Sequence, residues 1–209
     1  MKRSAVQTVC GCASVLLSYP DDRFADDLAA VAGALDRVPD GPARSRLGAA
    51  QRWLAAMPVI EAAARYVDTF DLRRQRTLHL TYYRHGDTRE RGMALTALVD
   101  AYRGAGLRVQ EGELPDFLPA LLELAAVDSA GLAVLGEHRP ALDALRSDLD
   151  AADSPYAGVV SAVAGVLGSA SHADREALRR YRANGPPSEQ VGLEPFAPPE
   201  IIKLGITRR

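Results

Sequence analysis

Apolar residues recur at helical spacing in one short segment after another, and this pattern most constrains the fold. Near the N-terminus Val9, Ala13 and Leu16 lie on one helical stripe. With 36 Ala and 26 Leu in 209 residues and only 6% aromatic residues, the composition also favours helix over strand. The predicted helices cover residues 4–19, 21–38, 43–56, 58–70, 73–83, 88–103, 117–125, 131–149, 154–167 and 172–182.

Two parts of the chain depart from this pattern. Residues 77–83 read TLHLTYY, which suits a strand by propensity, but no partner strand is visible, so we predict a helix there. From residue 184 onward Pro and Gly are frequent, which is typical of an extended tail. We therefore predict an all-α protein: a single-domain helical bundle over residues 1–183 and an extended tail over 184–209.

Charge and cysteine content limit the function classes. The chain has 25 basic and 27 acidic residues, so it lacks the basic excess typical of nucleic-acid-binding proteins. Cys10 and Cys12 have no second cysteine pair for a structural zinc site, and they are interpreted as packing residues in a reducing compartment. The first predicted helix is amphipathic and residues 153–174 are too polar to span a bilayer. We predict a cytoplasmic protein without stable membrane insertion or nucleic-acid binding.

The common catalytic motifs are missing from the sequence. It has no Gly-rich phosphate loop, no His-Glu-x-x-His and no Gly-x-Ser-x-Gly. The four histidines are scattered, and the acidic residues 21–27 are interpreted as the solvated first turn of a helix. These observations predict a protein that is not an enzyme and has neither a metal site nor a cofactor.

Polar and aromatic residues are concentrated instead in two loops that enter helices. The first surrounds the turn at Gly86 and contains Tyr82, His85, Asp87 and Arg91. Asp87 and Glu90 have the spacing of a capping box. The second runs through residues 113–119, ELPDFLP, where we expect Asp116 to cap the next helix. Such helix entries expose backbone N–H groups that can hold a peptide, although both could simply be well-capped helix starts.

Three segments resemble one known family. They are residues 66–71 (YVDTFD), 81–92 (TYYRHGDTRERG) and 113–119. Together they are similar to the nitrate reductase molybdenum cofactor assembly chaperones, also called nitrate reductase delta subunits or the NarJ family, within the TorD-like group. The resemblance extends from about residue 17 to residue 123. Phe117 stands where the wider group often has His, which puts a polar role for that position in doubt.

The resemblance implies an all-helical, TorD-like chaperone. It implies binding to the apo catalytic (alpha) subunit of a respiratory nitrate reductase in the cytoplasm, largely through that subunit's N-terminal segment. The chaperone would support molybdenum cofactor insertion before the enzyme docks at the membrane. A homo-oligomer is compatible with such a bundle.

The mechanism we expect is a peptide bound in a groove with an apolar floor and a charged rim. The peptide-binding residues predicted from the two loops are Tyr82, His85, Asp87, Arg91, Glu113, Asp116, Leu118 and Leu122. Tyr82, Leu118 and Leu122 would form the floor. The alternative is an all-α small-ligand-binding regulator or enzyme, which would require a closed cavity with convergent titratable groups.

Overall fold

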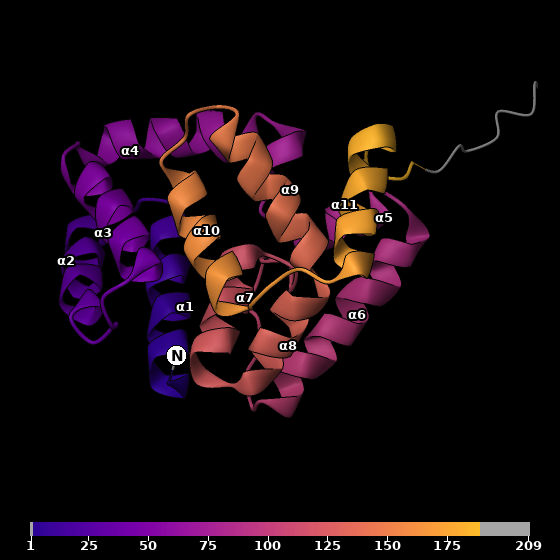
Figure 1. Ribbon diagram of the computed structural model, residues 1–209, viewed down its shortest axis with the longest axis horizontal. Helices are drawn as coiled ribbons and strands as arrows, with labels where there is room; N and C mark the ends of the chain where they lie inside the picture. The colour runs from indigo at the N-terminus through magenta and orange to yellow at the C-terminus, as the bar shows by residue number, and fades with distance from the viewer. Residues whose placement is uncertain (1, 189–209) are drawn as a thin grey trace, which may run out of the picture.

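The computed structural model describes residues 2–188, and every regular element in that part of the chain is helical (Figure 1). The α-helices are α1 (Arg3–Leu17), α2 (Phe24–Leu35), α3 (Pro42–Ala55), α4 (Val59–Tyr66), α5 (Leu80–His85), α6 (Arg89–Gly104), α7 (Leu118–Val127), α8 (Ser129–Glu137), α9 (Arg139–Asp150), α10 (Tyr156–Val166) and α11 (His172–Asn184). A π-helical turn, η1 (Val67–Asp71), extends α4, and a 3₁₀ turn, η2 (Arg74–Arg76), follows it. The predicted all-α fold is confirmed.

The core is centred on α1, α7 and α10. Helix α1 packs against both other helices, and α10 packs in turn against α3 and α9. Leu16, Leu121 and Val160 represent this core and have at most 1% of their surface exposed. The Ser14 hydroxyl donates a 2.9 Å hydrogen bond to the Pro119 carbonyl, which satisfies the one polar side chain that α1 buries.

An aromatic cluster fixes α3, α4 and α10 to one another. The Tyr156 ring meets the Trp53 ring edge-on at 5.2 Å and the Phe70 ring at 4.9 Å. Tyr66 contacts Phe70 at 4.9 Å. Edge-on contacts of this kind stabilise beyond simple burial. The cluster places η1, and with it the segment that leads into α5.

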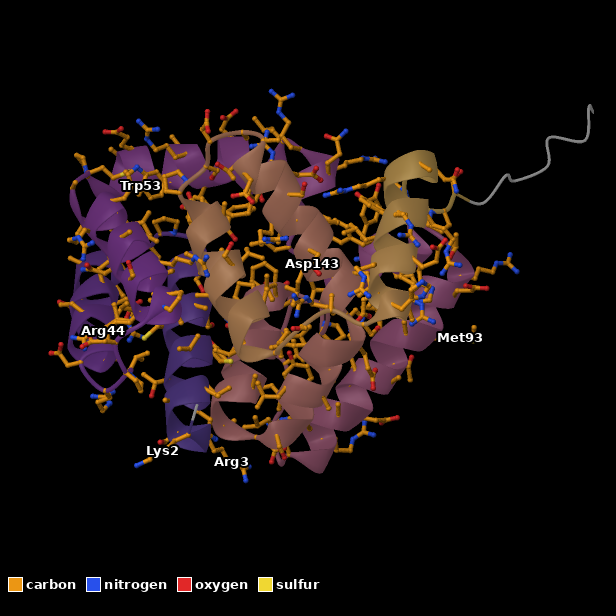
Figure 2. The ribbon with its side chains drawn as sticks, in the orientation of Figure 1. Lys2, Arg3, Arg44, Trp53, Met93 and Asp143 are labelled. Atoms are coloured by element: carbon orange, nitrogen blue, oxygen red, sulfur yellow. The ribbon has the colours of Figure 1, made fainter. Side chains whose placement is uncertain are left out.

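Helices α5, α6 and α11 lie together at one side of the bundle, on the right in Figure 1. Helix α6 buries only Leu98 and Tyr102 of its sixteen residues, and α11 buries none of its thirteen. Met93 projects from the outer face of α6 and is 70% exposed, whereas Asp143 lies inside on α9, paired with Arg139 (Figure 2). Helices α6 and α11 therefore bury the smallest share of residues among the described α-helices.

The predicted helix over residues 131–149 is wrong, because the structure has two helices there. Helix α8 ends at Glu137, and α9 begins at Arg139 after the non-helical His138. Pro140 explains the break, because proline lacks an N–H and its ring clashes with the carbonyl four residues earlier. At the start of α8, the Gly131 backbone lies close to the backbone of α7. A Cβ on Gly131 would lie 2.2 Å from the Ala125 nitrogen, so this position has no room for a side chain.

The predicted helix over residues 73–83 is also partly wrong. Helix α5 begins only at Leu80, and the preceding His79 is extended, with φ −88° and ψ 101°. His79 forms an isolated antiparallel bridge with Phe117. The strand-like propensity of residues 77–79 is thus expressed as a single bridge instead of a sheet.

Helix α11 is the last helix of the described residues. Helix α11 ends at Asn184, and Gly185 adopts a positive φ of 71° after it. Most of the predicted tail, residues 189–209, lies outside the described residues, so the domain boundary stays a prediction.

Cys10 and Cys12 are buried free thiols, as expected for packing residues. Among residues 2–188, no helix combines the length and apolar character needed to cross a membrane.

Candidate functional site

The second loop lies beside residues 78–80, which lead into α5, and Arg91 of the first loop reaches the same junction. The Leu80 N–H donates to the Asp116 carbonyl at 3.0 Å, and the Leu118 N–H donates to the Leu78 carbonyl at 2.8 Å. The His79 and Phe117 rings lie 5.5 Å apart across this bridge. Residues more than thirty positions apart are therefore held in one register, at the N-terminal ends of α5 and α7.

Asp116 is the polar centre of this junction. Its carboxylate accepts hydrogen bonds from the Thr81 N–H at 3.2 Å, from the Thr81 hydroxyl and from His79 Nδ1 at 3.1 Å. The Arg91 guanidinium approaches it at 3.4 Å. Burial alone would raise the pKa of Asp116, but the hydrogen bonds from His79 and Thr81 and the charges of His79 and Arg91 outweigh it. The pKa therefore lies below its usual value.

Asp116 is neither a helix cap nor a rim residue. The residue that caps α7 is Phe117, which has no side-chain capping bond, and the Asp116 side chain is fully buried. Its carboxylate is turned toward α5 because Thr81, His79 and Arg91 offer more donors there than the first turn of α7 does. Asp116 thus connects the two loops and presents no surface to a partner.

Above this junction lies a surface depression of about 350 Å³, here called the α5–α6 hollow. Charged residues dominate its rim. Arg74 and Arg91 each lie 3.7 Å from a carboxylate oxygen of Asp87, whose side chain is 64% exposed. The lining consists of Phe70, Asp71, Arg74, Thr77, His79, Tyr82, Asp87 and Arg91.

Three of the predicted binding residues, Tyr82, Asp87 and Arg91, line the α5–α6 hollow together. Glu113 does not join them, because it lines a separate depression of about 330 Å³ beside α7. His85 is partly buried, and its Nδ1 lies 3.5 Å from Glu90 Oε2 without a hydrogen bond to any described residue.

Leu118 and Leu122 do not form the floor of a groove in this conformation. Both have 0% of their surface exposed and belong to the core, as the helical pattern of α7 predicts. The apolar part of the α5–α6 hollow comes instead from Phe70 and Tyr82. An apolar residue on the inward face of a helix packs in the core and is therefore not available for binding at the surface.

The expected capping box at Asp87 is absent. Thr88 is the N-cap of α6 and makes no side-chain capping bond; its hydroxyl donates to the His85 carbonyl at 2.8 Å. Asp87 is therefore free to pair with Arg74 and Arg91 across the hollow.

Sequence reasoning missed His79, Arg74 and Phe70 as site residues. The signal for His79 was present in the strand-like alternation of residues 77–81, which puts its side chain opposite Leu78 and Leu80. Phe70 lies in the segment 66–71 that resembles the family, but the places of Phe70 and Arg74 beside the hollow depend on how η1 and η2 turn toward α6.

Comparison with known proteins identifies the family. The model of the nitrate reductase delta subunit family matches residues 37–162, more than half of the chain. This chain belongs to the nitrate reductase delta subunit family. The match includes α5, α6 and α7, and thus both loops of the site.

Relatives carry two kinds of name. The chain is 31% identical over 156 residues to the probable nitrate reductase molybdenum cofactor assembly chaperone NarJ of Bacillus subtilis, covering 74% of this chain and 85% of that one. It is 32% identical over 169 residues to NarJ of Escherichia coli K12, covering 78% and 71%. It is 46% identical over 154 residues to the nitrate reductase-like protein NarX of Mycobacterium tuberculosis H37Rv. That match covers 73% of this chain but only 23% of NarX, so the chain corresponds to about a quarter of that relative.

Proposed function

We propose that this chain is a system-specific chaperone for the catalytic subunit of a nitrate reductase. It binds the apo subunit, largely through the subunit's N-terminal segment, and supports molybdenum cofactor insertion before the enzyme docks at the membrane. The similarity to the B. subtilis assembly chaperone over 85% of that protein carries the proposal. The role is non-catalytic and cytoplasmic, and the molybdenum cofactor is cargo of the partner.

The α5–α6 hollow is the surface we assign to the partner peptide. Tyr82 supplies apolar contact, while Arg74, Arg91 and Asp87 supply charges of both signs around it. Apolar contacts give such a peptide its affinity, and the rim charges set its register and suppress wrong partners. The 3.4 Å ion pair with the buried Asp116 carboxylate holds the Arg91 guanidinium in position.

A calorimetric titration with a synthetic peptide of the catalytic subunit's N-terminal segment tests the binding step. We expect saturable one-to-one binding that Asp87→Lys weakens at least about tenfold, equivalent to about 1.4 kcal/mol. Asp22→Lys, an exposed aspartate in the connection between α1 and α2, is the matched control and should bind like the natural chain. The absence of both heat and NMR shifts on adding the peptide would rule out binding of this segment.

Co-purification from cells tests the assembly step. The tagged chain is expressed with its nitrate reductase, and the captured material is examined for the catalytic subunit and for molybdenum. We expect the subunit to be captured without molybdenum. Capture of a subunit already loaded with molybdenum would contradict the assembly role, even if the peptide binds.

A further inference from the structure

The chain just after α11 lies against the turn between α5 and α6. Residues 185–188, here called the strap, are the last of the described residues. Gly185 has a φ of 71°, and its N–H donates to the Tyr181 carbonyl at 2.7 Å, so the chain leaves the helix in a sharp turn. Helices α5 and α11 are neighbours in Figure 1, and the Tyr83 and Tyr181 rings lie 5.2 Å apart. The strap therefore begins beside α5.

Gly86, at the end of α5, is the residue that the strap contacts. A Cβ on Gly86 would stand 1.7 Å from the Pro187 carbonyl oxygen, and the three heavy atoms nearest to it would all belong to Pro187. Gly86 also has a φ of 55°, which residues with a side chain rarely adopt. It is buried, although the side chain of the next residue, Asp87, is 64% exposed. The strap thus covers the Gly86 backbone, and a side chain at position 86 would displace it.

Other glycines with a positive φ lack such a contact. Gly106, Gly112 and Gly168 have φ values of 73°, 89° and 85°, and a Cβ on any of them would meet nothing within 4 Å beyond its own chain neighbours. The local turn is enough to explain a glycine at these three positions. At Gly86 the close approach of a distant segment adds a second requirement.

The turn under the strap also carries part of the α5–α6 hollow. The Gly86 N–H donates to the Tyr82 carbonyl at 2.8 Å, and Asp87 follows Gly86 directly; Tyr82 and Asp87 both line the hollow. The ion pairs of Asp87 with Arg74 and Arg91 are exposed and 3.7 Å long, and pairs of this kind contribute little to holding a backbone in place. The backbone contact between the strap and the buried Gly86 is therefore the stronger constraint on the turn.

We propose that the strap is a positioning element of the α5–α6 hollow: by packing on Gly86 it holds Asp87 at the rim. The inference rests on the proposed function, because the hollow is the surface assigned to the partner peptide. A rim residue that is ordered before binding loses less conformational entropy when the peptide arrives. Pro186 and Pro187 suit this role, because proline fixes its own φ and the strap then loses little freedom on packing.

NMR relaxation of the full chain without peptide tests the contact. In the natural chain we expect the Ser188 amide to have an order parameter of about 0.85, like a rigid helix. Gly86→Ala should lower the order parameter of Ser188 to below about 0.6 and should also lower that of Asp87. Gly106→Ala is the matched control, because it introduces the same side chain at a positive φ into open space, and it should change neither value. A flexible Ser188 in the natural chain, or an ordered Ser188 in Gly86→Ala, would overturn the proposal.

Peptide affinity, measured by calorimetry, tests the positioning role. We expect Gly86→Ala to weaken the catalytic subunit's N-terminal peptide by about 1.5- to 5-fold, as Asp87→Asn does, because the strap acts through Asp87. Combining Gly86→Ala with Asp87→Asn should weaken binding no further than either change alone, since the two changes remove one shared contribution. Gly106→Ala should bind like the natural chain. Fully additive losses, or unchanged affinity with a flexible strap, would overturn the positioning role.

A second variant covers the case in which Gly86→Ala does not fold. Pro186→Gly combined with Pro187→Gly loosens the strap and leaves every residue of α5 and α6 unchanged. It should lower the order parameters of Ser188 and Asp87 and weaken the peptide in the same direction. A loosened strap with unchanged affinity would contradict the positioning role alone. A natural chain that binds no peptide would contradict the proposed function and this role together, so the two failures are distinguishable.

Discussion

Helices α10 and α11 follow one another in the sequence but differ in what they bury. Seven of the eleven residues of α10 are buried, among them Tyr156, Val160 and Val163, and the helix packs against α1, α3 and α9. None of the thirteen residues of α11 is buried, and its main neighbour is α9. One helix holds the bundle together, whereas the other covers it from outside.

The same contrast divides the whole molecule. Helices α1, α7 and α10 form the close-packed part, while α6 and α11 bury few residues, and α6 begins beside the α5–α6 hollow. Weakly packed elements open at low free-energy cost, which suits surfaces that exchange partners. The Asp116 network connects the two parts, because it joins the start of α7 to α5 and α6. Stability should therefore depend on the first part and on this network, and binding on the second part.

The largest expected effect is at Asp116. We expect Asp116→Ala to lower the free energy of unfolding by about 3–5 kcal/mol, because Arg91, His79 and Thr81 lose the carboxylate that they share. Urea denaturation followed by circular dichroism measures the loss. Asp22→Ala is the control and should leave the midpoint unchanged. Equal midpoints for the two variants would show that the two parts are not coupled through this carboxylate.

The next effect compares one leucine in each part. Leu122→Ala should cost about 2–5 kcal/mol, because Leu122 is fully buried in the core. Leu178→Ala on α11 should cost less than about 1.5 kcal/mol, because that side chain is only partly buried and its site can collapse. The same denaturation experiment measures both. Similar losses would mean that α11 is as firmly packed as α7, which would contradict the comparison.

A smaller effect is expected for Thr81→Val. We expect this change to lower the free energy of unfolding by about 1.5–3 kcal/mol at neutral pH, because it removes the hydroxyl that donates to the Asp116 carboxylate. The folded pKa of Asp116 is lowered, so its stabilisation is complete above the unfolded value near 3.9 and is lost as the pH falls through the folded value. Without the Thr81 hydroxyl that folded pKa rises, so the acid limb of the stability curve should move to higher pH. Thr96→Val, at an exposed site on α6, is the control and should leave the limb in place. An unmoved limb in Thr81→Val would exclude Thr81 as a cause of the shift.

Much of the close-packed part could be predicted from the sequence. Periodicity alone placed Leu118, Leu121, Leu122 and Ala125 on the inward face of α7, and all four are buried. This succeeds because burial of a helical face depends on spacing within one segment. The same burial explains why Leu118 and Leu122 do not line the α5–α6 hollow, since neither side chain has any of its surface exposed.

The junction between the loops could not be predicted in the same way. Asp116 precedes a helix, so local rules make it a cap, but its partners Thr81 and His79 lie 35 and 37 positions away. One bridge between His79 and Phe117 is also too short to leave a strand pattern in both segments. Contacts between distant segments decide these side chains, and a single sequence does not show them. The resemblance of the two loops to one family singled out these segments without giving this geometry.

The smallest expected effect separates binding from stability. Asp87 is 64% exposed, and its ion pairs with Arg74 and Arg91 are 3.7 Å long, so Asp87→Asn should change the free energy of unfolding by less than about 0.5 kcal/mol. The same change removes a rim charge without changing the shape of the α5–α6 hollow. We expect it to weaken the partner peptide by about 1.5- to 5-fold, equivalent to about 0.2–1 kcal/mol, and less so at high salt. Calorimetry at two salt concentrations measures this, with Asp22→Asn as the control. A stability loss as large as that of Thr81→Val would place Asp87 with the Asp116 network, and the division between a stabilising and a binding part would then fail at this residue.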